Sequence, residues 1–181
     1  SVADSQTVES SVRRSYSTGN ITCSRVGDGT PNVGGFIGAI SVSQDANVVP
    51  SINNNFTVSA VNTSNGANQG NSYGFVASYN RPVSFTNTSL TDPDLSSNAF
   101  DITRTGRNAC SGSSLISCNG VNANNSEPNY FKIDNASGFF GGSWEIGENW
   151  QYSVSYPVHT PTTVRSDPPT NLNVVRDGDN F

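Results

Sequence analysis

One aromatic stretch constrains the fold of this chain more than any other feature. Residues 138–158 read GFFGGSWEIGENWQYSVSYPV and contain both tryptophans of the sequence, so the most apolar area per residue lies there. In its second half Trp150, Tyr152 and Tyr156 alternate with polar residues, the period-2 pattern of a half-buried strand. Gly147 predicts the turn of a hairpin that pairs residues 143–146 with residues 149–156. We therefore expect this stretch to form an inner strand of a layered β fold.

The composition favours a β-rich protein of the kind found outside cells. The chain has 181 residues, a length that one domain covers. Hydrophobic residues make up 33% and charged residues only 13%, whereas disordered chains couple low hydrophobicity to high charge. Short alternating segments separated by turns every 8–12 residues predict about eight to ten strands. The expected fold is mainly β, an antiparallel β-sandwich or jelly-roll-like domain with a short N-terminal α-helix.

The N-terminal segment is the part of the chain with helical spacing. Val8, Val12 and Tyr16 recur every four residues, and Gly19 with Asn20 ends the pattern. The apolar stripe is thin, so such a helix would have to pack against the β domain or a neighbouring chain. The expected organisation is an N-terminal helix over residues 1–19, a β-rich globular domain over residues 20–159, and a linker and tail strand over residues 160–181.

The charge of the chain disfavours two classes of partner, nucleic acid and anionic lipid surfaces. The formal net charge is −5, whereas nucleic acid and anionic lipid surfaces both attract basic proteins. No apolar run approaches the roughly 20 residues that a membrane-spanning helix needs. We expect no nucleic-acid partner and no membrane span in this chain.

Three cysteines leave the pairing open. Cys110 and Cys118 enclose a short loop with Gly112 inside it, and they can close a small disulfide in an oxidising compartment. A bond from Cys23 to either of the other two is equally permitted by the sequence. Three cysteines and the single His159 lack the paired close spacing of a zinc site.

Few residues are candidates for catalysis. Glu145 and Glu148 flank the predicted turn, and a glycosidase needs two carboxylates that face one sugar. Residues beside a turn are usually solvated, however, and no nucleophile or carboxylate motif accompanies His159. We therefore expect a protein without enzymatic activity and without an organic cofactor.

Calcium is the one metal that the sequence suits. Asp177 and Asp179 place carboxylate oxygens on one turn, and Asp92 and Asp94 with Asp101 nearby do so on another. Aspartate is also a default turn residue, so a purely structural role fits the same positions.

Two kinds of carbohydrate contact are suggested by the sequence. Trp144, Trp150 and Tyr152 would form a sugar-stacking platform if they were exposed, although an alternating aromatic strand is usually core. N-glycosylation sequons occur about as often as chance predicts, so glycosylation is permitted and not specifically indicated. The sequons begin at Asn20, Asn55, Asn62, Asn87, Asn124 and Asn135.

The C-terminal tail contains a segment that resembles part of a known family. Pro168-Pro169-Thr170-Asn171-Leu172-Asn173-Val174 resembles the opening strand of a fibronectin type III domain, which implies a modular surface protein. Without that resemblance, the tail is a candidate strand for completing the sheet of a neighbouring subunit.

The overall organisation resembles the soluble headgroup of a type IV pilin-like protein. The resemblance rests on an N-terminal helix followed by a polar, glycine-rich β domain with a small disulfide loop. The prepilin cleavage site and the hydrophobic start of that family do not occur in this sequence. The resemblance implies a cell-surface filament subunit that contacts copies of itself or other surface proteins. The alternative is a carbohydrate-binding or receptor-binding β-sandwich module of a larger surface protein.

Overall fold

The structure is a computed structural model, and it describes residues 10–24, 32–64, 71–124, 130–131, 147–148, 150–151 and 157–159. The first ten strands fall into two successive groups of five. The first group comprises β1 (Ser11–Arg13), β2 (Tyr16–Ser17), β3 (Ile21–Ser24), β4 (Val33–Gly34) and β5 (Ile37–Ser41). The second comprises β6 (Ser51–Asn53), β7 (Phe56–Thr57), β8 (Val61–Ser64), β9 (Ser72–Tyr73) and β10 (Val76–Asn80). The remaining elements are β11 (Ala99–Asp101), α1 (Ile102–Thr105), β12 (Asn119–Val121), β13 (Trp150–Gln151) and β14 (Val158–His159).

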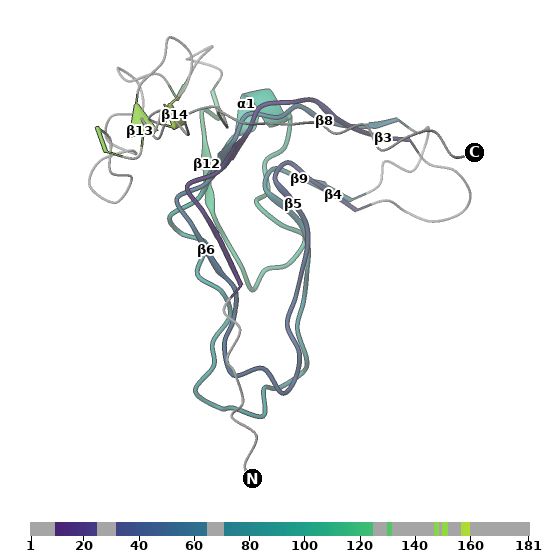
Figure 1. Ribbon diagram of the computed structural model, residues 1–181. Coiled ribbons are helices and arrows are strands. Elements are labelled where there is room, and N and C mark those ends of the chain that lie inside the picture. The colour runs from purple at the N-terminus through teal and green to yellow at the C-terminus, as the bar shows by residue number, and fades with distance from the viewer. Residues whose placement is uncertain are drawn as a thin grey trace, which may run out of the picture.

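Each strand of the first group pairs in parallel with the corresponding strand of the second. Ser11 lies opposite Ser51 and Ile21 lies opposite Val61, so the separation along the chain is the same for both pairs of partners. The pairs β4–β9 and β5–β10 continue the parallel arrangement. Such regular parallel pairing means that the chain completes one coil and stacks the next coil on it. The described residues from β1 to β12 therefore form a parallel β-helix, which Figure 1 shows with its coils lying over one another.

The antiparallel sandwich expected from the sequence is not the observed architecture. Within the described ranges only β13 and β14 pair antiparallel. Turn signals every few residues mark the corners of a coil as well as they mark hairpins, and alternation does not reveal the direction of the partner. The prediction of a mainly β protein is confirmed, whereas the predicted pairing is wrong for the coils.

The expected N-terminal helix is also wrong where the structure describes the chain. Residues 1–9 lie outside the described part, and β1 and β2 occupy much of the rest of the predicted helix. Val12 pairs with Ile52 and Tyr16 pairs with Phe56. A helix here would be weakly stabilised, because its apolar stripe is thin. The parallel ladder provides hydrogen bonds for the backbone N–H and C=O groups that a helix would otherwise pair. The proposed boundary after residue 19 consequently falls inside the first coil.

Each of the first two coils has a stem and an arm. In Figure 1 the stem runs downward between β6 and β5, and the arm extends to the right with β8 and β3 above β9 and β4. The bend that follows the first stem strand needs a left-handed backbone: Arg14 has φ 52° and its equivalent Asn54 has φ 57°. The repeated corner keeps the two coils in register.

The third coil is shorter than the first two. Ala99 of β11 pairs with Phe56, as the register of the stack requires. Ala99 also lies opposite Asn119 of β12, so the chain comes back to this sheet after fewer residues than in the first two coils. Helix α1 begins directly after β11, where the earlier coils enter the arm, and Gly106 ends it with φ 66°. The Cys110–Cys118 disulfide, with a Cα–Cα distance of 5.6 Å, closes the return loop. The helix and the disulfide loop thus replace the long excursions of a full coil.

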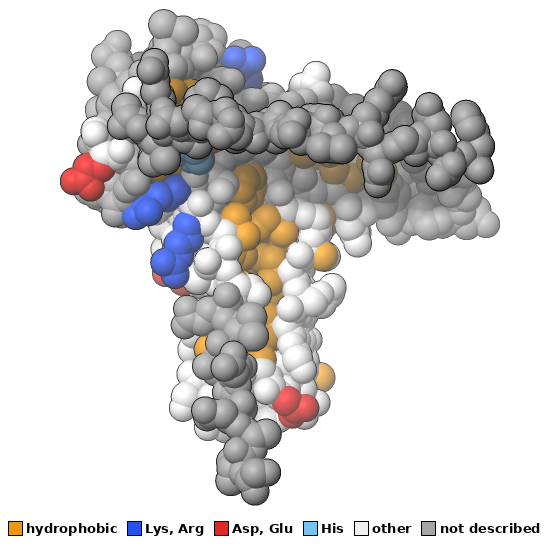
Figure 2. Space-filling view, viewed as in Figure 1, with side chains coloured by type: hydrophobic (Ala, Val, Ile, Leu, Met, Phe, Trp, Pro, Cys, Tyr) orange, Lys and Arg blue, Asp and Glu red, His pale blue; other side chains and the backbone are white. Residues whose placement is uncertain are grey.

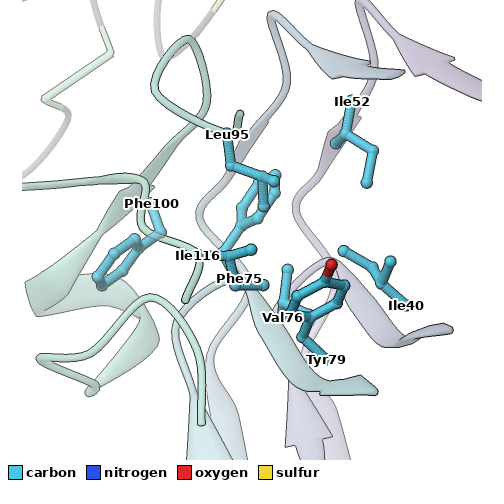
Figure 3. Packing of buried hydrophobic residues seen from close by; sticks show 8 residues of the cluster. All are labelled: Ile40, Ile52, Phe75, Val76, Tyr79, Leu95, Phe100 and Ile116. Carbon is cyan, nitrogen blue, oxygen red and sulfur yellow. The ribbon is translucent and has the colours of Figure 1, made fainter. Parts of the chain in front are cut away.

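The hydrophobic core lies inside the stack. Phe36 and Phe75, from successive coils, stack with their ring centroids 4.9 Å apart. Figure 3 shows side chains from several segments directed toward one another within this core. The buried members of the cluster are Ile40, Ile52, Phe75, Val76, Tyr79, Leu95, Phe100 and Ile116. Removal of these side chains from water is the main favourable contribution to folding.

Two asparagines connect the coils at the bend of the stem. Asn55 and Asn98 are fully buried, and the Asn55 Nδ2 donates to the Asn98 Oδ1 at 2.8 Å. The Asn55 Oδ1 also accepts from the Ser15 backbone N–H at 2.8 Å, so one side-chain row links three successive rungs. Buried amides of this kind must be fully hydrogen-bonded, which fixes the register of the stack.

Candidate functional site

Trp150 lies in an aromatic cluster on the outer face of the sheet β12-β11-β7-β2. Its side chain is 0% exposed, and its ring lies 5.9 Å from Tyr16 and 6.0 Å from Phe56 between centroids. Phe131 packs on Phe56 from the same side, at 4.8 Å. Trp150 therefore acts as core and is not available to stack on a sugar. Trp144 and Tyr152, the other members of the predicted platform, lie outside the described residues.

The predicted turn at Gly147 is present. Gly147 has φ 97°, and its N–H donates to the carbonyl of Trp150 at 2.7 Å. The partner strand of Trp150 is β14, because Trp150 pairs with His159. Residues 143–146, the strand that the sequence pairs with this segment, lie outside the described part.

The candidate catalytic residues form no catalytic arrangement within the part of the chain that the structure describes. Glu148 is exposed in the turn, and Glu145 lies outside the described ranges. The His159 Nε2 contacts the backbone oxygen of Arg14, and its ring lies against Trp150 with centroids 4.4 Å apart. A histidine with these partners holds two segments together, which is a structural role.

The aspartates of the predicted calcium cluster are engaged by protein partners. Asp101 caps α1 by accepting from the Arg104 N–H at 2.9 Å, and it also accepts from the Asn122 Nδ2. The Asp94 Oδ1 accepts from the Ser96 N–H at 2.8 Å, and this hydrogen bond lowers the pKa of Asp94. Among the described residues no group of three acidic, histidine or cysteine side chains is placed to hold a metal. Asp177 and Asp179 lie outside the described ranges.

Asp92 belongs to a network at the end of β10. The Tyr79 hydroxyl donates to the Asp92 Oδ1 at 2.7 Å, and the Arg81 Nη1 donates to the Asp92 Oδ2 at 2.7 Å. Burial, and after it the hydrogen bond and negative charge of Asp92, raise the pKa of Tyr79 well above its usual value of about 10. The network stabilises the end of the stem and requires a protonated tyrosine.

This network predicts a loss of stability at alkaline pH. Because the folded state binds the Tyr79 proton more tightly than the unfolded state, the stabilisation is complete below about pH 10 and is lost as the pH rises above it. We expect the free energy of unfolding to fall more steeply above pH 10 in the native chain than in Tyr79→Phe. Urea unfolding from pH 8 to pH 11 measures both slopes, and equal slopes would contradict the assignment.

The structure gives the pairing of the cysteines and the exposure of most of the sequon asparagines. Cys110 and Cys118 form the disulfide, which is one of the pairings that the sequence permits, and Cys23 is half-buried without a disulfide partner. Asn55 is 0% exposed, so its sequon is inaccessible in the folded chain. Asn20, Asn62, Asn87 and Asn124 are exposed, whereas Asn135 lies outside the described residues.

A recess of about 400 Å³ lies in the arm, between β8 and the C-terminal half of α1. It is lined by residues 60–63 on one side and residues 104–107 on the other. The Arg107 Nη2 donates to the carbonyl of Val61 at 2.8 Å, and the Arg107 Nη1 donates to the carbonyl of Gly106 at 3.1 Å. Among the described residues that line the recess, two are arginines and none is acidic, so these residues carry a positive charge in a chain whose net charge is −5.

The arm recess was not identified from the sequence. Arg104 and Arg107 belong to no recognisable motif, and they meet β8 only because α1 replaces the third pass of the chain through the arm. The sequence does contain one signal of the coiled fold, which is a repeat of similar residues at the spacing that places the two coils in register. Ser11-Val12 recurs as Ser51-Ile52, and Ile21-Thr22 recurs as Val61-Asn62 at the same spacing.

Comparisons with known proteins give no relative: no family model, no curated protein and no solved structure matches this chain. Within the described ranges, no helix has the length and hydrophobicity needed to cross a bilayer. The features of this chain that bear on its function are therefore the stack of parallel coils and the side chains on its surface.

Proposed function

We propose that this chain is a non-enzymatic structural or adhesive subunit of an extracellular filament. It acts through contacts of its surface with copies of itself or with neighbouring surface proteins. The observation that carries the proposal is the stack of parallel coils. Coiled folds of this kind bury their core by stacking one coil on the next, and they grow along one axis.

The surface and the chemistry of the described residues support this proposal. Figure 2 shows hydrophobic side chains in a stripe along the stem, bordered largely by backbone and uncharged side chains. Val12, on the first coil, is 39% exposed, and β1 has β6 as its one strand partner among the described elements. An apolar stripe beside unpaired strand edges favours association with another protein surface. The disulfide favours an oxidising, extracellular location.

Self-association of the purified full chain tests the proposal. We expect sedimentation velocity to show species larger than a monomer as the concentration rises, and electron microscopy to show elongated particles. The chain with its Cys110–Cys118 disulfide reduced is the control, because the loop that this bond closes shapes the third coil. A chain that stays monomeric at every concentration and binds no cell surface would contradict the proposal.

A carbohydrate-binding or receptor-binding module is the alternative function. The burial of Trp150 disfavours it, because the remaining sugar platform would consist of Trp144 and Tyr152. Acrylamide quenching with and without a panel of glycans separates the two functions. Tryptophan fluorescence that changes on glycan binding would favour the alternative over a purely structural role.

A further inference from the structure

The arm of the coil stack is one strand pair thick, whereas the sheet β12-β11-β7-β2 beside it is wider. β8 pairs with β3 on one edge. The Ile21 N–H donates to the carbonyl of Ala60, so the peptide groups of Val61 and Thr63 face the opposite edge, as alternate residues of a parallel strand do. Helix α1 occupies the position where a third arm strand would begin. No third strand pairs with β8 among the described elements.

The open edge of β8 coincides with the arm recess. One carbonyl on this edge, that of Val61, accepts from Arg107. Two buried polar atoms at the recess, the Thr63 Oγ1 and the Arg107 Nε, have no hydrogen-bond partner. Buried polar groups are normally satisfied, so this edge has the features of an incomplete site. A partner that supplies backbone hydrogen bonds and negative charge would complete it.

We propose that residues 171–175 of a second copy of this chain add to the open edge of β8 as a third arm strand. This inference rests on the proposed filament function and specifies one of its contacts. Residues 171–175 read NLNVV, which combines β-branched and apolar residues with polar ones. The segment from His159 to Leu172 spans up to roughly 40 Å when extended, which is long enough to reach a neighbouring molecule.

Charge determines the orientation of the added strand. Asp177 and Asp179 follow the apolar segment after one intervening residue, Arg176, and outnumber it in charge. Arg107 lies at the end of β8 where the chain enters the arm. An antiparallel strand brings the two aspartates to that end, beside the recess that Arg104 and Arg107 line. A parallel strand places them at the other end. The tail strand is therefore antiparallel to β8, and its acidic end neutralises the recess.

Disulfide trapping between two differently labelled populations tests this contact. One population carries Thr63→Cys and the other carries Val174→Cys, both in a Cys23→Ser background because Cys23 lies opposite Thr63 and would capture the new thiol. Mixing and mild oxidation should give a disulfide-linked heterodimer. Asn87→Cys, at an exposed position in the loop between β10 and β11, replaces Thr63→Cys in the matched control and should give none. Circular dichroism of each variant verifies that it folds.

The charge contact has its own readout. Asp177→Asn with Asp179→Asn should reduce the trapped heterodimer by roughly threefold, the size expected for loss of a partly exposed ion pair. High salt should reduce it similarly in the parent pair. An unchanged yield would overturn the proposed orientation.

Three results distinguish this inference from the filament proposal. If the full chain assembles and deletion of residues 162–181 prevents assembly, the inference is supported. If the full chain assembles and the deletion changes nothing, the inference is overturned and the filament proposal stands. If a single chain with both cysteines cross-links only within itself and stays monomeric, the tail completes its own arm and the contact between copies is wrong.

Discussion

Replacing Asn98 with alanine is expected to lower the free energy of unfolding by about 3–5 kcal/mol. The Asn98 Nδ2 donates to the carbonyl of Ile52 at 2.7 Å, and the Asn98 Oδ1 accepts from the Asn55 N–H at 3.1 Å. Both partners are fully or almost fully buried, so alanine leaves them without water or protein to bond. Each buried group left unpaired costs about 1–3 kcal/mol, and the Asn55 side-chain amide loses a partner as well.

Urea unfolding followed by circular dichroism measures this loss. Asn80→Ala is the matched control, because Asn80 is exposed on β10 and should change the free energy of unfolding by less than about 0.5 kcal/mol. A loss below about 1 kcal/mol for Asn98→Ala would show that the asparagine row does not hold the coils together.

Alanine at Gly34 should be more damaging than alanine at Gly38 in the same coil. A Cβ at Gly34 would come within 3.0 Å of three backbone atoms, which belong to Ile37, Ala77 and Phe75. These backbone groups belong to the ladder between successive coils and cannot move without breaking hydrogen bonds. We expect Gly34→Ala to cost about 3 kcal/mol or more, or to prevent folding.

Gly38→Ala is the internal control for this comparison. A Cβ at Gly38 would meet nothing within 4 Å. Alanine there should leave stability unchanged or raise it by about 0.5 kcal/mol, because it reduces the freedom of the unfolded chain. Thermal unfolding of the two variants in parallel gives the answer. Equal melting temperatures would mean that the two coils are not packed as closely as the structure has them.

Local features of this protein follow from its sequence. The turn at Gly147 was predicted because glycine adopts positive φ without strain. The Cys110–Cys118 bond was among the permitted pairings because the two residues lie close together along the chain. Short strands separated by turns, which the sequence predicts, are present as well, and β3 is one of them. In each case the deciding interactions lie within a few residues of one another along the chain.

The contacts of the aromatic cluster around Trp150 were less predictable than the strands. Trp150 was assigned correctly to a buried strand, but its contact with Tyr16 joins residues that are far apart in the sequence. The segment around Tyr16 was predicted to be helical because every fourth residue is apolar. The left-handed bend at Arg14 changes which side chains share a face. Apolar residues four positions apart therefore do not indicate a helix in this segment.

The sequence by itself determined that this chain is rich in β-strands and has polar turns, and it permitted a short disulfide loop. The tertiary structure decided that each strand of the first coil pairs in parallel with its equivalent in the second, and that α1 ends the third coil at the arm. The physical reason is that alternation and turn residues specify only the local path of the backbone. The partner of each strand is set by the stacking of whole coils, in which Asn55 and Asn98 satisfy each other and the aromatic rings align.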